Sequence, residues 1–328
     1  MSVNLYAQED VDALLNRIDD LERQMNDLTE QAEARKRLEI TEKERVEKEK
    51  EVLEAVDRDY TLMERGSFGL DYSLSYSYSP TELFIDDQAG YRKQSDHTVT
   101  HMIAMSYAIL NNLTVDSDIP IMYRYNKIGT EDELDETDIG DITVGVVYQP
   151  FKAPQGEMTS NFSLNVILPT GKSPFDIALE NELSTGSGSY SVSAGVNFSK
   201  PVDPVVFFGS MSIGYRFPVT GLNQINSQRI LNEVTPGENI SFGLGLAYSL
   251  SYEVYMNMQF SGSYTLENEY VFDDGAFEYE SPTDTNASFV MGLGWKASQK
   301  TTVTMSTSWN LTEPGFSLTC RVPFTFVM

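Results

Sequence analysis

The sequence is poor in the residues that carry most catalytic and covalent chemistry. Among 328 residues it has one cysteine, Cys320, and two histidines, His97 and His101. A single cysteine excludes an intrachain disulfide, and two histidines limit acid–base and metal chemistry. The sequence also contains no HExxH, no CxxC and no phosphate-binding glycine loop. We therefore expect no catalytic residue, no metal and no cofactor, and we predict that the protein is not an enzyme.

Positive charge and long apolar runs are scarce as well. The chain has 23 Lys and Arg residues against 49 Asp and Glu residues, which gives a formal net charge of −26. Such an acidic chain is not expected to bind nucleic acid or an anionic membrane surface. No apolar run approaches the roughly 20 residues that a membrane-spanning helix needs. A helical membrane span is therefore excluded.

Residues 1–35 show a helical apolar period. Apolar side chains recur at alternating steps of three and four, which predicts a coiled coil of about three heptads. The number of strands stays open, because Ile18 with its neighbouring leucines favours two and Leu15 widens the stripe and favours three. One amphipathic helix packed on a domain is the alternative. The predicted oligomerisation seam is Val11, Leu14, Ile18, Leu21, Met25, Leu28 and Ala32.

Residues 36–62 read as a different, solvated helix. The stretch KRLEITEKERVEKEKEVLEAVD has few apolar residues and carries Glu-to-Lys pairs four residues apart, such as Glu39–Lys43, which support an exposed helix. Nothing in it could bury a core of its own. It could run through water or lie in a water-filled cavity. Its candidate contact residues are Leu38, Ile40, Val46, Leu53 and Val56.

From residue 63 to residue 328 the period changes to two. In SFGLDYSLSYSYS, which begins at Ser67, the even positions are large and apolar or aromatic and the odd positions are small or polar. This alternation is typical of a strand with one apolar face. We count twelve such segments, at about 66–78, 97–109, 112–125, 140–149, 159–169, 188–198, 205–217, 239–250, 253–266, 286–297, 301–311 and 316–327.

Two features favour lipid over a protein core as the neighbour of the apolar faces. Long polar connections, at about 79–96, 126–139, 170–187, 218–238 and 267–285, alternate with short turns, as in outer-membrane barrels. The opposite faces carry Ser, Thr, Gly and Asn rather than the Lys and Glu of a soluble sandwich surface. The sequence therefore predicts an all-β transmembrane barrel of twelve antiparallel strands, preceded by an α-helical coiled coil.

Scattered charges fall on the face predicted to line the lumen. We expect most of them to pair across the lumen and the rest to tune selectivity. Both histidines and Cys320 fall on the outward face instead. The predicted lumen charges are Asp71, Asp116, Asp118, Arg124, Asp141, Arg216, Glu253, Lys296 and Arg321.

Three stretches resemble a known family: TDIGDITVGVVYQP at 137–150, ILPTGKSP at 167–174 and ELSTGSGSYSVSAGVNFSK at 182–200. They are similar to the broad family of outer-membrane transporters named for a MetA pathway of phenol degradation. Within it, the layout best resembles the secretion channel of functional amyloid (Fap) systems. That resemblance implies export of amyloid subunits as partner polypeptides, a homotrimer through a periplasmic coiled coil at 1–35, and a lumen plug within 36–62. It implies a place in the bacterial outer membrane among its lipids.

Two other functions remain open at this stage. The chain could be a porin for aromatic or other hydrophobic small molecules, as the broad family suggests, or a closed structural barrel that tethers the envelope. The sequence shows no clear apolar path through the lumen, which counts against the porin.

Overall fold

The computed structural model describes residues 62–85, 90–128, 132–151, 157–178, 181–202, 205–226, 229–251, 253–298 and 301–327. The predicted coiled coil at 1–35, with its seam, and the predicted linker helix at 36–62, with its five plug candidates, therefore lie outside the described residues except for Leu62. Within the described ranges, no helix has the length and the apolar character needed to cross a bilayer.

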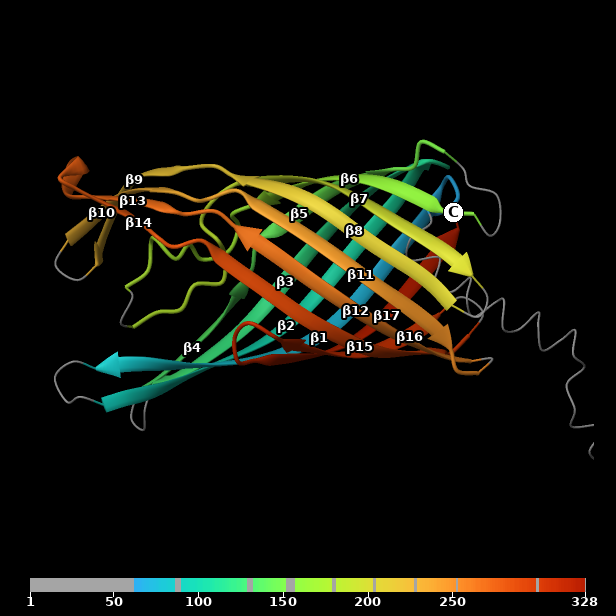
Figure 1. Cartoon of the computed structure of the whole chain (residues 1–328). Helices are drawn as coiled ribbons and strands as arrows, with labels where there is room; N and C mark the ends of the chain where they lie inside the picture. Colours follow the sequence, from blue (N-terminus) through green and yellow to red (C-terminus); the bar gives the residue numbers. More distant parts are fainter. Residues whose placement is uncertain are drawn as a thin grey trace, which may run out of the picture. The chain divides into compact units, whose positions relative to one another are not determined.

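Twelve strands form one closed antiparallel ring (Figure 1). The ring closes because β1 pairs with both β2 and β17, and β2 also pairs with β3. Each of the twelve predicted segments is confirmed as one strand of the ring. A closed ring leaves no unpaired strand edge inside a membrane. The strands are β1 (Ser67–Ile85), β2 (Gly90–Leu110), β3 (Leu113–Ile128), β5 (Ile142–Tyr148), β6 (Thr159–Leu168), β7 (Ser191–Val202), β8 (Val205–Arg216), β11 (Asn239–Ser249), β12 (Val254–Thr265), β15 (Asp284–Lys296), β16 (Thr302–Asn310) and β17 (Phe316–Val327).

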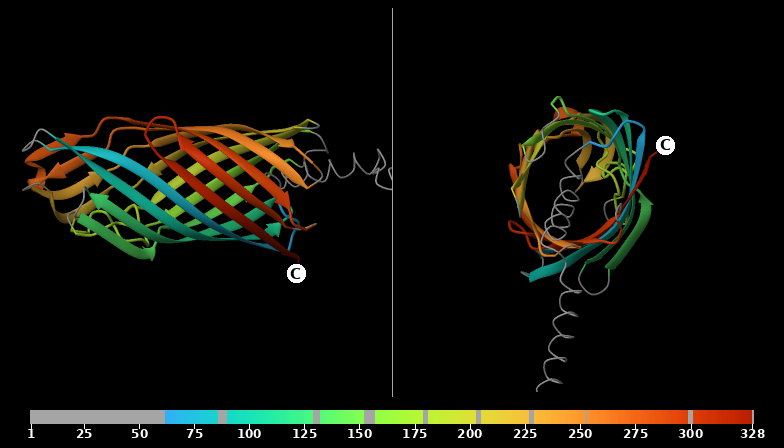
Figure 2. Two further views of the ribbon diagram at one scale, coloured as in Figure 1. Left: turned by 90° about the horizontal axis from the view of Figure 1, so that it is seen from below. Right: turned by 90° about the vertical axis from the view of Figure 1, so that its right-hand side faces the viewer.

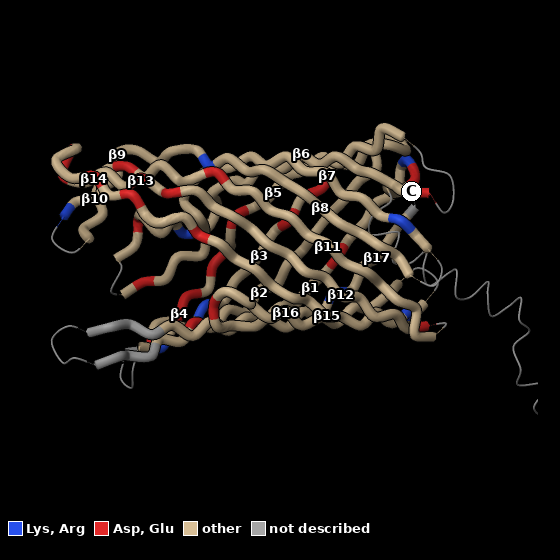
Figure 3. The backbone as a smooth tube through the Cα atoms, in the orientation of Figure 1, with Lys and Arg blue, Asp and Glu red and all other residues tan. Residues whose placement is uncertain are grey.

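The outer face of the ring is apolar. The large side chains of the alternating pattern remain exposed after folding, for example Leu164 at 51%, Ile213 at 58% and Trp295 at 54%. In water, such a large exposed apolar surface would be unfavourable, whereas in a bilayer the lipid hydrocarbon covers it. Figure 3 shows long stretches of strand without a charged residue, and most charges near the two ends of the barrel.

The two ends of the barrel differ. At one end, the turn end, short connections such as Asn111-Asn112 join the strands, and β1 begins and β17 ends there. At the other end, the hairpin end, strands continue far beyond the ring (Figure 1). Here the prediction of long loops is wrong for four of the five segments. They form the extended β1–β2 hairpin and the additional strands β4 (Asp132–Ile139), β9 (Val219–Asn226), β10 (Arg229–Thr235), β13 (Glu269–Phe272) and β14 (Phe277–Glu280), with a 3₁₀ turn η2 (Asp273–Gly275).

The reason is that the additional strands are only four to eight residues long, and a register shift between Leu231 and Glu233 interrupts the alternation in β10, so the period-two pattern cannot detect them. Strands β9, β10, β13 and β14 form a separate four-stranded sheet. Its small core is Leu222, Leu231 and Val234, each at most 8% exposed. In the remaining predicted connection, residues 170–187, the described residues form no strand.

Candidate functional site: the barrel interior

A cavity of about 810 Å³ occupies the barrel interior at the turn end. Its wall comes from strands that are far apart in the sequence, β1, β2, β3, β5, β12, β16 and β17, and the residues just before β1 add to it. The lining residues include Leu62, Met63, Glu64, Asp71, Met102, Ala104, Thr114, Asp116, Asp118, Val147, Tyr255, Thr304, Arg321 and Pro323.

The charged side chains of this cavity are mostly acidic. Four carboxylates, those of Glu64, Asp71, Asp116 and Asp118, line it together with one guanidinium, that of Arg321. Arg321 Nη2 donates to Asp71 Oδ2 at 2.5 Å. The pair forms because barrel closure sets β17 beside β1, with Arg321 opposite Ser73. Four predicted lumen charges therefore meet around one cavity.

Apolar side chains share the same cavity. Met102, Val147, Tyr255 and Pro323 occupy inward positions of their strands. Tyr255 is 5% exposed and packs with Val206, Phe208 and Ala247. Its ring lies over Gly294, where an added β-carbon would come within 2.6 Å of the Tyr255 hydroxyl oxygen. The sequence shows no clear apolar path through the lumen, whereas the structure gathers these apolar side chains around the cavity at the turn end.

Sequence reasoning missed these residues although their parity marks them. Tyr255 alternates with the outward Val254 and Met256, and Met102 alternates with the outward His101 and Ile103. Because most inward residues of each strand are small and polar, a single large inward residue near a strand end does not stand out in the sequence.

At the hairpin end, the described part of residues 169–190, which leaves out 179–180, folds against the inner wall. Figure 2 shows this segment inside the ring of strands. Arg124 Nη1 donates to the Ser184 carbonyl oxygen at 2.6 Å, and Arg124 Nη2 donates to Asp96 at 2.5 Å. Lys172 Nζ donates to Glu136 Oε2 at 2.8 Å. Glu136 lies opposite Arg124 in the register of β3 and β4. The segment is thus held to the wall by neighbouring charged groups.

The three sequence stretches that carry the family resemblance meet at one point, which we call the Asp141 junction. Asp141 accepts hydrogen bonds from the backbone N–H groups of Gly171 at 3.1 Å and Ser187 at 2.6 Å. Thr170 donates to the Gly140 carbonyl at 2.8 Å, and Thr185 donates to the Ile139 carbonyl at 2.9 Å. The motif residues therefore anchor the segment rather than perform chemistry.

Glycine is needed at the Asp141 junction because two backbones touch there. A β-carbon on Gly171 would lie 2.7 Å from Gly186 Cα, and one on Gly186 would lie 2.9 Å from Gly171 Cα. On the opposite side of the segment, Gln224 Nε2 donates to the carbonyls of Pro174 and Ile177 at 2.7 and 3.0 Å. Phe175 packs against the Leu222, Leu231 and Val234 core. Residues 169–190 thus connect β3–β5 with the four-stranded sheet.

Two titratable groups of this segment are shifted by their partners. The hydrogen bond to Glu136 raises the pKa of Lys172. The Ala178 N–H, followed by the charge of Lys172, lowers the pKa of Glu182. Lys172 Nζ lies 3.5 Å from Glu182 Oε1. Both shifts favour the ionised forms and so favour the folded position of the segment at neutral pH.

The remaining predicted lumen charges lie apart from both features. Arg216 ends β8, and Lys296 ends β15, where its backbone N–H donates to the Glu253 carbonyl at 2.7 Å. The histidines lie on the outer face as predicted, where Tyr72 and Tyr76 hydroxyls bond His101 and His97 at 2.7 and 2.9 Å. Cys320 is a free, half-buried thiol.

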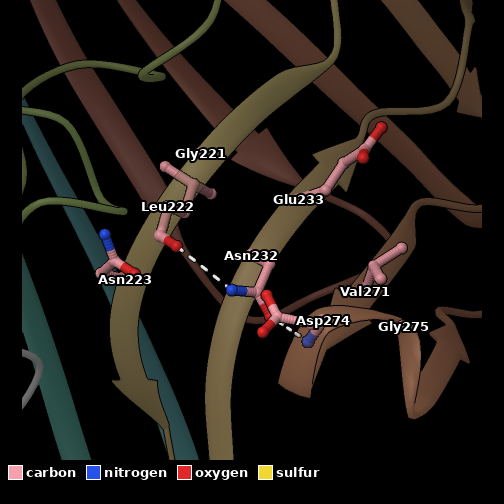
Figure 4. Close-up of a pocket in the computed structure, with 8 residues that line it drawn as sticks. All are labelled: Gly221, Leu222, Asn223, Asn232, Glu233, Val271, Asp274 and Gly275. Atoms are coloured by element: carbon pink, nitrogen blue, oxygen red, sulfur yellow. Dashed lines mark hydrogen bonds between the residues drawn. The ribbon is translucent and has the colours of Figure 1, made fainter.

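A second hollow of about 490 Å³ lies in the four-stranded sheet (Figure 4). It opens where the β9–β10 pairing shifts register, and Asn232 bridges this gap. Asn232 Nδ2 donates to the Leu222 carbonyl at 3.5 Å, and the Asp274 N–H donates to Asn232 Oδ1 at 2.8 Å. Since these groups satisfy one another, the hollow is less suited to a ligand than the interior cavity.

The closed ring, its apolar outer face and its polar, hollow interior define a bacterial outer-membrane β-barrel of the channel class. The chain belongs to the family described as "Putative MetA-pathway of phenol degradation", whose sequence model matches residues 84–319. The fold is similar to that of the COG4313 outer membrane channel from Pseudomonas putida F1. That match has a TM-score of 0.61 and 14% identity over 82% of this chain and 98% of the other.

Two further solved structures are more distant. The transport unit of the autotransporter AIDA-I from Escherichia coli matches with a TM-score of 0.47 and 11% identity, over 86% of this chain and 98% of its own. The CymD monoaromatic hydrocarbon channel matches with a TM-score of 0.39 and 8% identity, over 81% and 89%. The COG4313 match therefore shows the fold that the two chains share, that of an outer-membrane channel barrel.

Proposed function

We propose that this channel admits small aromatic compounds through the outer membrane. The observation that carries the proposal is the turn-end cavity, in which Met63, Met102, Val147, Tyr255 and Pro323 offer apolar surface inside an otherwise polar bore. Its volume of about 810 Å³ lies within the roughly 300–1,000 Å³ of small-molecule sites. The family description, which names phenol degradation, supports the same class of solute.

The interior suits small solutes better than a polypeptide. Residues 169–190 lie against the inner wall at the hairpin end, and Leu62 and Met63 line the cavity at the turn end. A polypeptide in transit would have to displace the contacts of the Asp141 junction. Secretion of amyloid subunits rests on a resemblance of the whole layout, and the coiled coil and plug that it implies within residues 1–62 lie, except for Leu62, outside the described residues.

Filling the cavity tests the proposal. The Ala104→Trp substitution places a large ring in the cavity wall. We expect the wild-type chain, expressed in the outer membrane of a bacterium that lacks comparable channels, to speed uptake of a radiolabelled monoaromatic compound at low micromolar concentration. The A104W variant should lose most of that gain.

The matched control is Leu164→Trp, which adds the same ring on the outer face, where Leu164 is 51% exposed. It should leave uptake unchanged. If wild type, A104W and vector take up the compound equally, the proposal is wrong. The same strains, co-expressing an amyloid-forming subunit, would reveal secretion as the alternative.

A further inference from the structure

The wall of the turn-end cavity contains polar groups that the protein itself leaves unsatisfied. Thr114 is only 6% exposed and lines the cavity, yet among the described residues its hydroxyl oxygen has no hydrogen-bond partner. Two positions further along the same inward face of β3, Asp116 Oδ1 is buried and likewise has no partner within the described ranges. Buried polar atoms are normally paired, so an unpaired set in a cavity wall points to a ligand.

Local packing fixes the Asp116 carboxylate at the wall. Asp116 is opposite Gly145 across β3 and β5, and a β-carbon at Gly145 would lie 2.9 Å from Asp116 Cγ. The absence of a side chain at Gly145 therefore provides the space that the Asp116 carboxylate occupies. One oxygen of that carboxylate is left without a donor, and the hydroxyl of Thr114, two positions earlier on the same strand, can both donate and accept.

The chemistry of this pair matches a hydroxyl group. A hydroxyl can donate to a carboxylate oxygen and accept from a threonine O–H at the same time. Asp118 follows on the same face, and the cavity holds four carboxylates but only one guanidinium. A negatively charged ligand would therefore be repelled. Apolar side chains of the same cavity, Met102 on the neighbouring strand β2 and Pro323 on β17, can contact a ring.

Resting on the proposed function, we propose that the Thr114–Asp116 site selects neutral aromatic compounds that carry a hydroxyl donor, and rejects aromatic carboxylates. Phenol represents the selected class and benzoate the rejected class, because at pH 7 a phenolic hydroxyl is neutral and a carboxyl group is ionised. Toluene has the same ring without a polar group.

The test is ligand-observed NMR of the full chain in detergent, titrated separately with phenol, toluene and benzoate, with protein-free micelles as the reference. We expect apparent affinity to fall in the order phenol, toluene, benzoate. Asp116→Asn should weaken phenol binding by about tenfold, because a hydrogen bond to a charged acceptor is lost, and should leave toluene unchanged. Glu278→Gln, an exposed acid on β14, is the charge-matched control and should change nothing.

A second variant covers the case in which D116N fails to fold, as judged by heat-modifiable migration on a gel. Thr114→Val keeps the shape of the side chain and removes the hydroxyl, and it should weaken phenol but not toluene binding. Equal binding of phenol and benzoate, or phenol binding that neither variant alters, overturns the selectivity while leaving aromatic transport standing. If none of the three compounds binds, both this inference and the proposed function fail.

Discussion

The two ends of the barrel interior are built in different ways. At the turn end the cavity is bounded by regular strands, and its character follows from single inward side chains such as Tyr255 and Asp116. At the hairpin end the interior holds the irregular segment 169–190, which is fixed by hydrogen bonds to Arg124, Glu136 and Asp141. The comparison teaches that one strand pattern supports two kinds of interior. The turn end holds a cavity lined by both charged and apolar side chains, and the hairpin end holds an anchored segment.

The largest expected effect concerns the separate sheet at the hairpin end. Leu231→Ala removes a side chain that is 3% exposed from a three-residue core, and should destabilise that sheet by about 3 kcal/mol. Limited proteolysis should then cut within β9 and β10, while the barrel keeps its heat-modifiable migration on a gel. Concerted loss of the barrel would show that the two ends are not independent.

The next effect concerns the anchor of the segment. Asp141→Ala removes the acceptor of two N–H groups and should destabilise the folded position of residues 169–190 by about 2 kcal/mol. In planar bilayers we expect single-channel conductance to rise severalfold. Asp135→Ala, an exposed acid of β4, is the control. Conductance that is the same in both variants would mean that the segment does not constrict the bore.

A smaller effect should distinguish the turn end. Since acids outnumber bases in its cavity, the reversal potential in a KCl gradient should indicate a preference for K⁺. The double substitution Asp116→Asn and Asp118→Asn should reduce the K⁺ to Cl⁻ permeability ratio by about twofold or more at low salt. An unchanged ratio would place the selectivity of the channel elsewhere.

The smallest effect is the pH dependence of the segment. Because the pKa of Glu182 is lowered, its contribution is present above the ordinary value of 4.5 and is lost as pH falls through the lowered pKa. The raised pKa of Lys172 gives a contribution that is present below 10.5 and is lost as pH rises through the raised pKa. Conductance should therefore increase slightly below about pH 4.5. In Glu182→Gln that acid step should be smaller; an identical step would assign it to other carboxylates.

How far the sequence predicts this molecule depends on the element. All twelve ring strands are predicted by the two-residue alternation of apolar and polar side chains, because each strand has one face toward hydrocarbon and one toward water. The hairpin-end strands β4, β9, β10, β13 and β14 are not, because they are short and a register shift interrupts the alternation in β10. Residues 170–187 are predicted as a long polar connection and form no strand in their described part, yet their inward position depends on Asp141 and Gln224, which are remote in the chain.

The candidate site divides in the same manner. The sequence places Asp71, Asp116, Asp118 and Arg321 on the inner face. It does not show that these four share one cavity, or that Asp71 and Arg321, which are 250 residues apart, form an ion pair. It also conceals the apolar part of the wall, since Met102 and Val147 become neighbours of these charges only through the registers of the β1–β2, β2–β3 and β3–β5 pairings.

The sequence by itself determined the wall: which residues face outward, how many strands there are and that the chain is acidic. These properties are local, since each strand needs only its own alternation to sort side chains between two media. The tertiary structure alone decided the contents of the bore. Which side chains face one another across it depends on register, on the β1–β17 closure and on the packing of residues 169–190, and these are set by contacts between distant parts of the chain.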